Sequence, residues 1–308
     1  MIKKTYLKKI LSWCVIAAVA VFFGITLADN WSNVRELTVD FNGYTFIGII
    51  SFIAAVVVSG VLWGKILEKL SGKKIAIIEA IEIHSASWLL KYIPGQVGSY
   101  VNKIAWGIKK GISKKTISTS FIYENVLMVF AGFALATPII IVLAENSGLE
   151  LSFFLPFFVL IPLAIVLVRP VFRGLLNIIV KLAKRAPFKD SDFLDTPKLF
   201  LYQLHYFLPR ILNGIGFVFI VQTIIPVTPD MYIGLASAYI LASIVGLLAI
   251  FVPGGLGVRE SIIVITLSVY VPIEQAIIIS LLARLYATIA DGGVAIIYAV
   301  LKKRRSYE

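Results

Sequence analysis

Apolar blocks of about 20 residues recur along this chain, and short clusters of lysine and arginine separate them. An α-helix rises about 1.5 Å per residue, so a block of this length crosses the roughly 30 Å hydrocarbon core of a bilayer. Only 15% of the 308 residues are charged, whereas a soluble domain keeps about a quarter of its residues charged. The pattern predicts an all-α polytopic membrane protein, organised as a single transmembrane domain over residues 1–308.

Six of the blocks are predicted to span the membrane as simple helices. The first follows a basic N-terminus, and its end at Thr26-Leu-Ala28 also resembles a signal-peptide cleavage site. We favour a retained helix, because the run is longer than a usual signal core and further spans follow it. The predicted spans are Ile10–Ala28, Tyr44–Gly64, Ile117–Ala144, Leu151–Val168, Leu199–Ile224 and Gln275–Leu301.

The basic residues gather in alternate loops, as the positive-inside rule expects. This placement accounts for the net charge of +12 without nucleic-acid binding. It predicts that both termini are cytoplasmic and that the protein is integral to the plasma (inner) membrane of a prokaryote. The loops on the other side hold a single basic residue, Arg35. The clusters predicted to be cytoplasmic are Lys3–Lys9, Lys65–Lys74, Lys103–Lys115, Arg169–Lys189 and Lys302–Arg305.

Neither a metal nor a cofactor is expected from the sequence. The single cysteine, Cys14, lies in the first block, so it forms no disulfide within the chain and no thiolate metal site. His84 and His205 lie near predicted helix ends without the acidic spacing of a zinc site. The chain also lacks the Gly-Lys-Ser/Thr phosphate loop, Gly-x-Ser-x-Gly and His-Glu-x-x-His.

Two further apolar stretches are interrupted by the same motif, Pro-Gly-x-x-Gly. Ile75–Ile108 contains Pro94-Gly-Gln-Val-Gly98, and Met231–Val271 contains Pro253-Gly-Gly-Leu-Gly257. Proline removes a backbone donor and glycine weakens a helix, so both stretches are predicted to break there. The flanking charges place both ends of the first stretch on the cytoplasmic side and both ends of the second on the outside. We therefore expect two re-entrant helical hairpins that open to opposite faces.

A shift of 159 residues superposes the two motifs and indicates an internal repeat. The same shift lays Tyr44–Gly64 on Gln203–Thr223 and lays Asn125 on Arg284. The predicted unit is helix, hairpin, helix, present twice with inverted topology, which is typical of transporters. Repeat A covers about residues 44–144 and repeat B about 199–301. An amphipathic cytoplasmic linker, about residues 170–197, is predicted between them.

The two breaks are expected to meet around a polar site, because non-helical backbone at membrane depth must be buried in protein or border a wet cavity. Helices that restart near Gly98 and Gly257 would point N–H groups and positive dipole ends into that site, and such ends bind phosphate. The backbone candidates for substrate binding are Pro94, Gly95, Gly98, Pro253, Gly254 and Gly257.

Ionisable side chains inside apolar blocks add further candidates, because a charge in a membrane is costly unless it is paired or functional. Arginine suits phosphate because its planar fork presents several donors. The side chains predicted to bind substrate are Lys91, Glu124, Asn125, Arg259, Glu260 and Arg284.

Simpler interpretations stay open for some basic residues. Lys91 alternatively reaches the membrane interface with its long side chain, and we favour this interpretation for Arg210. Arg259 and Glu260 alternatively form a structural ion pair.

The residues around both breaks resemble a known family. Leu90-Lys-Tyr-Ile-Pro-Gly-Gln-Val-Gly98, with Asn102-Lys103 and Tyr123-Glu124-Asn125, is similar to the first signature of the lysylphosphatidylglycerol synthase transmembrane-region family. Phe251-Val-Pro-Gly-Gly-Leu-Gly-Val-Arg-Glu260, with Leu281-Leu-Ala-Arg-Leu285, is similar to the second. The resemblance covers nearly the whole chain. It departs at Asn125, where the family often has arginine, and this weakens a symmetric two-arginine site.

The resemblance implies a flippase-like domain that handles anionic lipids or lipid-linked precursors. Some members carry a soluble aminoacyl-transferase domain, for which this chain has no room, so lysyl transfer is not expected. The leading hypothesis is translocation of an anionic lipid or a polyprenyl-phosphate-linked precursor. One alternative is an intramembrane polyprenyl-pyrophosphate phosphatase that uses Glu79 and Glu82 with Arg259-Glu-Ser261. The other is a membrane scaffold for an envelope glycan biosynthesis complex.

Overall fold

The computed structural model describes residues 42–92, 97–149, 152–182, 187–250 and 252–305. Every regular element in these ranges is a helix, which confirms the all-α prediction. The α-helices are α3 (Gly43–Ser71), α4 (Ile77–Leu89), α5 (Val97–Lys109), α6 (Lys114–Asn146), α7 (Leu155–Leu167), α8 (Arg169–Leu182), α9 (Thr196–Val221), α10 (Tyr232–Leu248), α11 (Val258–Leu267) and α12 (Ile273–Arg305). The 3-10 turns are η1 (Leu90–Tyr92), η3 (Ser152–Phe154), η4 (Asp190–Asp192), η5 (Pro229–Met231) and η6 (Pro253–Gly255).

Five helical stretches in the described ranges are long and apolar enough to cross a membrane. Four of them, α3, α6, α9 and α12, match predicted spans. The fifth, Pro229–Leu248, joins η5 to α10 and was predicted as the first limb of a hairpin. The predicted first span, Ile10–Ala28, lies outside the described residues. The protein is an integral membrane protein.

The predicted span Leu151–Val168 corresponds to α7, which is shorter than expected. Its 13 residues reach only about 20 Å as a helix. The chain then bends by 86° into α8, which begins the predicted amphipathic linker. On α8, Phe172 and Leu176 are buried in a cluster with Tyr123 and Leu199, while Lys181 is exposed. Part of the apolar face thus packs on the protein, while Leu175, Ile178 and Leu182 of the same helix are exposed.

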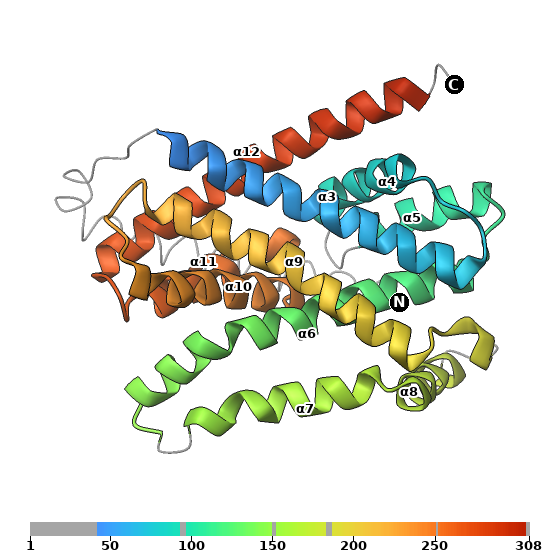
Figure 1. Cartoon of the computed structure of the whole chain (residues 1–308), viewed down its shortest axis with the longest axis horizontal. Coiled ribbons are helices and arrows are strands. Elements are labelled where there is room, and N and C mark those ends of the chain that lie inside the picture. Colours follow the sequence, from blue (N-terminus) through green and yellow to red (C-terminus); the bar gives the residue numbers. More distant parts are fainter. Residues whose placement is uncertain (1–41, 93–96, 150–151, 183–186, 251, 306–308) are drawn as a thin grey trace, which may run out of the picture.

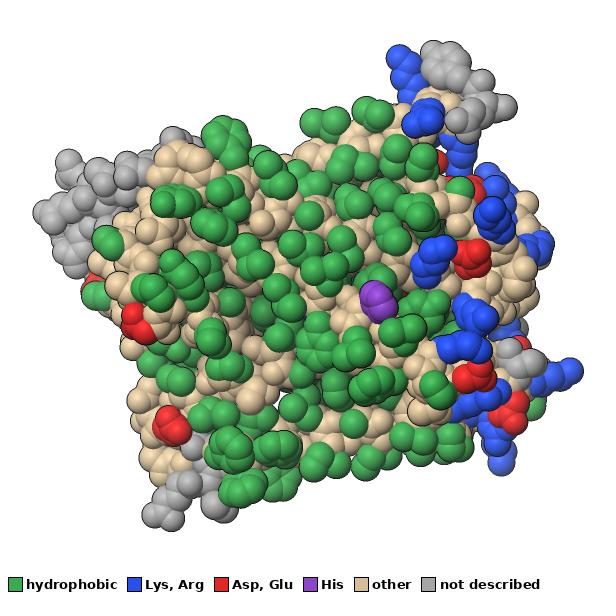
Figure 2. Space-filling model, in the orientation of Figure 1, with side chains coloured by type: hydrophobic (Ala, Val, Ile, Leu, Met, Phe, Trp, Pro, Cys, Tyr) green, Lys and Arg blue, Asp and Glu red, His purple; other side chains and the backbone are tan. Residues whose placement is uncertain are grey.

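Charge and hydrophobicity separate along the long axis of the molecule. Figure 2 shows lysine and arginine side chains gathered at one end, whereas hydrophobic side chains cover the middle of the visible face. The ends of α3, α5 and α12 lie toward this basic end in Figure 1, as do the start of α6 and the whole of α8. The predicted cytoplasmic clusters that the structure describes therefore share one end, whereas Lys3–Lys9 lies outside the described residues. The membrane side itself stays a prediction.

The two interrupted stretches each form a pair of packed helices. Helix α4 packs against α5, and α10 packs against α11. Figure 1 places the first pair toward the basic end and the second toward the opposite end. The order helix, helix pair, helix occurs twice, as α3, α4–α5, α6 and as α9, α10–α11, α12. That the pairs are re-entrant and the halves inverted stays a prediction.

The first helices of the two halves, α3 and α9, lie against each other through small residues. A Cβ added to Gly216 would come 2.9 Å from the carbonyl oxygen of Gly48, and one added to Gly48 would come 3.0 Å from the carbonyl oxygen of Gly216. Small residues let membrane helices approach closely and gain van der Waals contact. This close contact holds the two halves together beside the site.

Candidate functional site

The tips of the two helix pairs meet at the head of a cavity. Turn η1, at the end of α4, contacts η6, which precedes α11. The adjoining cavity has a volume of about 170 Å³. Six of the candidates predicted from sequence line it, namely Lys91, Glu124, Asn125, Gly254, Arg259 and Arg284. The second break borders the cavity through Gly254, and the first approaches it through Lys91, three residues before its motif. That both breaks border one substrate site stays a prediction.

The backbone at the second tip requires glycine. Gly254, Gly255 and Gly257 have φ values of 59°, 65° and 81°, which lie in the left-handed region that side chains with a Cβ rarely adopt. At Gly255 a Cβ would also lie 3.0 Å from the backbone of Gly246 on α10. The motif thus folds the chain tightly back against α10 and brings α11 to the cavity.

The first turn of α11 was expected to present free N–H groups to the site, and the structure differs from this expectation. The Gly257 N–H donates to Oε2 of Glu260 over 2.6 Å, so the carboxylate caps the first turn. Gly257 and Glu260 do not line the cavity directly. At the first tip, Pro94 and Gly95 lie outside the described residues, and Gly98 lies within α5 away from the cavity lining. At the second tip, Pro253 contributes to η6 through its backbone.

Arg284 of α12 ties the second tip to the last helix. Its Nη1 lies 3.5 Å from Oε1 of Glu260 and donates to the Gly254 carbonyl over 3.2 Å. Its side chain is 19% exposed. On the neighbouring helix α11, the guanidinium of Arg259 lies 4.4 Å above the ring of Tyr239, a cation–π contact. Glu260 thus forms an ion pair with Arg284 of α12, although Arg259 is its neighbour in the sequence.

Lys91 of the first tip contacts α12 as well. Its Nζ lies 2.7 Å from Oδ2 of Asp291, and the Trp88 indole N–H donates to Oδ1 of the same carboxylate over 2.7 Å. The ammonium also lies 4.1 Å over the Trp88 ring. Lys91 thus pairs with an acid at the cavity wall. The alternative that its side chain reaches out to the membrane interface is therefore wrong. Asp291 was not predicted, although an acid inside an apolar helix is itself a signal.

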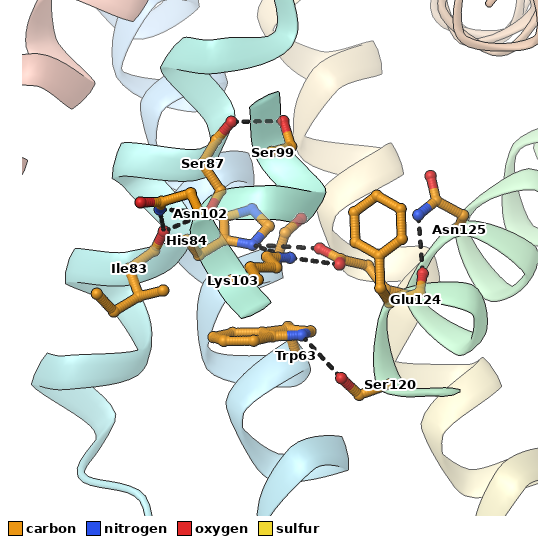
Figure 3. A network of polar contacts seen from close by, with 12 residues as sticks. Trp63, Ile83, His84, Ser87, Ser99, Asn102, Lys103, Ser120, Glu124 and Asn125 are labelled. Atoms are coloured by element: carbon orange, nitrogen blue, oxygen red, sulfur yellow. Dashed lines mark hydrogen bonds and ion pairs between the residues drawn. The ribbon is translucent and has the colours of Figure 1, made fainter. Parts of the chain in front are cut away.

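A buried network joins the first helix pair to α6 (Figure 3). Lys103 Nζ donates to Oε2 of Glu124 over 2.5 Å, and His84 Nδ1 lies 3.2 Å from Oε1. The ammonium also lies 4.3 Å over the Trp63 ring. Lys103 is 2% exposed, so its assignment to a cytoplasmic basic cluster is wrong. Lys103 lies two turns into α5 from the tip, and its side chain turns inward to meet Glu124.

Asn125 follows Glu124 on α6 and turns its amide toward the cavity side of the helix. Its Nδ2 donates to the Phe121 carbonyl over 2.8 Å, which leaves the amide oxygen available at the cavity wall. The position that matches Arg284 in the shifted alignment therefore carries a neutral group.

Arg210 of α9 also lines the cavity. It is only 5% exposed, so the interpretation that it reaches the membrane interface is wrong. With it, the described side chains at the cavity comprise five cations, Lys91, Lys103, Arg210, Arg259 and Arg284, and two acids, Glu124 and Asp291. Glu260 adds a third acid just behind Arg284. Cations exceed acids, and such a wall favours an anionic ligand.

The comparison with known protein families identifies the family of this chain. A model of the lysylphosphatidylglycerol synthase TM region matches residues 12–292. The chain belongs to this family. A comparison with curated proteins found no match. Membership indicates a membrane function related to lipids.

Glu79 and Glu82, which the phosphatase alternative requires beside Arg259, lie elsewhere in this family member. Arg305 Nη2 lies 3.1 Å from Oε1 of Glu82, and Lys110 Nζ lies 2.8 Å from Oε1 of Glu79. Neither glutamate lines the cavity. The structure therefore offers no acid pair for phosphate-ester chemistry among the described residues around Arg259 beyond Glu260 and Asp291, both of which have cationic partners.

Proposed function

We propose that this protein binds the anionic headgroup of a lipid, or of a polyprenyl-phosphate-linked precursor, between the hairpin tips and translocates it across the membrane. The observation that carries the proposal is the cavity at which the tips meet, with cations in excess of acids. Membership of the family supports a lipid as the ligand. The lipid tails would stay in the bilayer, where their apolar surface costs nothing.

Arg284 is the residue that we expect to exchange partners when the headgroup arrives. Its ion pair with Glu260 is 3.5 Å long and the side chain is partly exposed. A phosphate accepts two parallel hydrogen bonds from a guanidinium and competes well for such a group. Glu260 keeps its second partner, the Gly257 N–H, so it is not left unpaired during the exchange.

Translocation requires the site to face each side of the membrane in turn. The two helix pairs meet at their tips, η1 and η6, and lie toward opposite ends of the molecule in Figure 1. In inverted-repeat transporters, rocking of one half against the other opens a central site to each side alternately. We propose the same movement here, with the tip contact as its pivot.

The test is headgroup transfer in reconstituted liposomes. Fluorescent phosphatidylglycerol and a short polyprenyl diphosphate serve as probes, with phosphatidylcholine for comparison. Arg284→Ala should lower transfer of the accepted anionic probe at least tenfold, because a charged hydrogen bond is worth about 1.5–3 kcal/mol. The matched control is Arg173→Ala, which removes an arginine paired with Asp190 on the exposed side of α8. Unchanged transfer in folded Arg284→Ala protein would contradict the proposal.

A further inference from the structure

Arg210 differs from the other cations at the cavity in where it comes from. It belongs to α9, outside both helix pairs, and is almost fully buried. Its Nε is inaccessible to solvent and donates no hydrogen bond to any described residue. Buried guanidinium groups are normally paired, because a desolvated charge without a partner is costly. Its side chain therefore has donor capacity that the described part of the chain does not use.

The residues around Arg210 form a polar face along α9. Gln203, Tyr206, Arg210 and Asn213 are spaced by three, four and three residues, a spacing that puts them on one side of a helix. Oη of Tyr206 and Oε1 of Gln203 are also buried without a hydrogen-bond partner among the described residues. Asn213, one turn beyond Arg210, lines the same cavity. Of these four residues, Arg210 and Asn213 line the cavity, whereas Gln203 and Tyr206 do not. The unused Nε of Arg210 is therefore the group that points to a polar ligand in the cavity.

Each acid near the cavity is already engaged elsewhere. Glu124 contacts Lys103, Asp291 contacts Lys91, and Glu260 contacts Arg284. The positive charge of Arg259, which also lines the cavity, instead repels that of Arg210. An anion between Arg210 and Arg259 would relieve this repulsion and accept a hydrogen bond from the unused Nε of Arg210.

We propose that Arg210 forms a second anion-binding position, and that the cavity takes a lipid-linked diphosphate in preference to a monophosphate. The proposal rests on the proposed function, in which Arg284 binds the first phosphate. Cations at the cavity exceed the three acids by two. A diphosphate that links a lipid to a sugar carries two negative charges, whereas the phosphodiester of a phospholipid carries one. The two phosphates would each have an arginine as partner, Arg210 on α9 and Arg284 on α12, both of which line the cavity.

Binding of farnesyl diphosphate and farnesyl phosphate to the purified protein tests the proposal, because the two probes share one tail. The wild-type protein should bind the diphosphate at least tenfold more tightly. Arg210→Gln should remove this preference and keep monophosphate binding, whereas Arg284→Gln should weaken both. Inorganic diphosphate identifies the source of the anion, and it should bind more weakly than farnesyl diphosphate if the ligand is a lipid.

The melting temperature of Arg210 variants distinguishes a role in ligand binding from a structural role. Without ligand, Arg210→Gln should melt at the same temperature as the wild type or higher, because the substitution removes a buried charge that has no acidic partner among the described residues. A structural role predicts a lower melting temperature. Arg210→Lys, which keeps the charge without the fork of donors, should retain part of the diphosphate preference. Arg173→Gln is the control.

Equal affinity of the wild type for the two farnesyl probes would overturn the inference and leave the proposed function standing. Equal loss of both affinities in Arg210→Gln would overturn it as well. Equal affinity for inorganic and farnesyl diphosphate would assign the site to a soluble anion. Failure of every anionic probe to bind would overturn the proposed function itself.

Discussion

The two halves of the molecule place an ion pair between corresponding helices, with opposite polarity, although the residues themselves do not coincide in the 159-residue shift. In the first half, the return helix α5 carries the cation Lys103 and the following long helix α6 carries the acid Glu124. In the second half, the return helix α11 carries the acid Glu260 and the long helix α12 carries the cation Arg284. Each pair ties a helix pair to the long helix that follows it, so the contact is repeated although the residue types are exchanged.

The two ion pairs also differ in their length and in how deeply their side chains are buried. The Lys103–Glu124 contact is 2.5 Å long, with side chains 2% and 5% exposed, and His84 adds a second partner. The Arg284–Glu260 contact is 3.5 Å long, with the arginine 19% exposed. A buried and well-paired charge is costly to disturb, whereas a longer and wetter pair opens at little cost. We infer that the first pair holds the structure together and that the second is available for the ligand.

The largest effect on stability should follow Glu124→Gln. It leaves the Lys103 ammonium buried without its acid, and breaking a buried pair in this way costs about 3–5 kcal/mol. The apparent melting temperature in detergent should fall sharply. The double substitution Lys103→Met with Glu124→Leu should recover most of the loss, because no buried charge remains. If Glu124→Gln alone lowered the melting temperature only slightly, the proposed distinction between the two ion pairs would be wrong.

Glu260→Gln is the matched change in the second half and should cost only about 1 kcal/mol. The amide oxygen can still accept from the Gly257 N–H, which Glu260 now binds over 2.6 Å. Loss of the carboxylate should leave Arg284 freer to hold an anion, so release of a bound farnesyl probe should become slower. Dissociation measured by probe exchange checks this. Faster release would show that Glu260 supports the anion instead of competing with it.

An ion pair nearer the surface should contribute least to the free energy of unfolding. Lys115 Nζ lies 2.6 Å from Oδ2 of Asp192, whose side chain is 24% exposed, and such pairs contribute about 0–1 kcal/mol. Burial raises the pKa of Asp192, but the hydrogen bonds from Lys115 and from the Lys189 N–H outweigh burial and place the pKa below its ordinary value.

A lowered carboxyl pKa stabilises the folded state above the ordinary value of about 4, and this contribution is lost as the pH falls further. Asp192→Asn should therefore change the melting temperature little at pH 7. The difference from the wild type should shrink below about pH 4. A difference as large as that of Glu124→Gln would contradict the ranking.

The sequence predicted the helices well because their signal is local. The length and hydropathy of a block set whether it can cross a membrane, and α3, α6, α9 and α12 followed from this alone. Pro-Gly-x-x-Gly located both breaks. The short helix α7 was overestimated, because an apolar run does not show where the chain will bend.

Most of the predicted residues that line the cavity were identified because a charge interrupts an apolar block, whereas Asn125 and Gly254 followed from the internal repeat and the Pro-Gly-x-x-Gly motif. Arg259, Arg284 and Lys91 were identified in this way, and all line the cavity. Lys103 and Arg210 were misjudged, because proximity to a basic cluster or a helix end cannot reveal which way a long side chain turns. The partner choices of Glu124, Glu260 and Asp291 depend on contacts between segments far apart in the chain, so local sequence patterns could not indicate them.

The most direct test of the central claim is the lipid that the protein retains. Wild-type protein purified in mild detergent and analysed by native mass spectrometry should carry a phosphate-bearing anionic lipid. Arg284→Ala protein, prepared in the same way and folded, should lose it, while Arg173→Ala protein should keep it. Retention of the same lipid by Arg284→Ala, or retention of only neutral lipids by the wild type, would contradict a headgroup site between the hairpin tips.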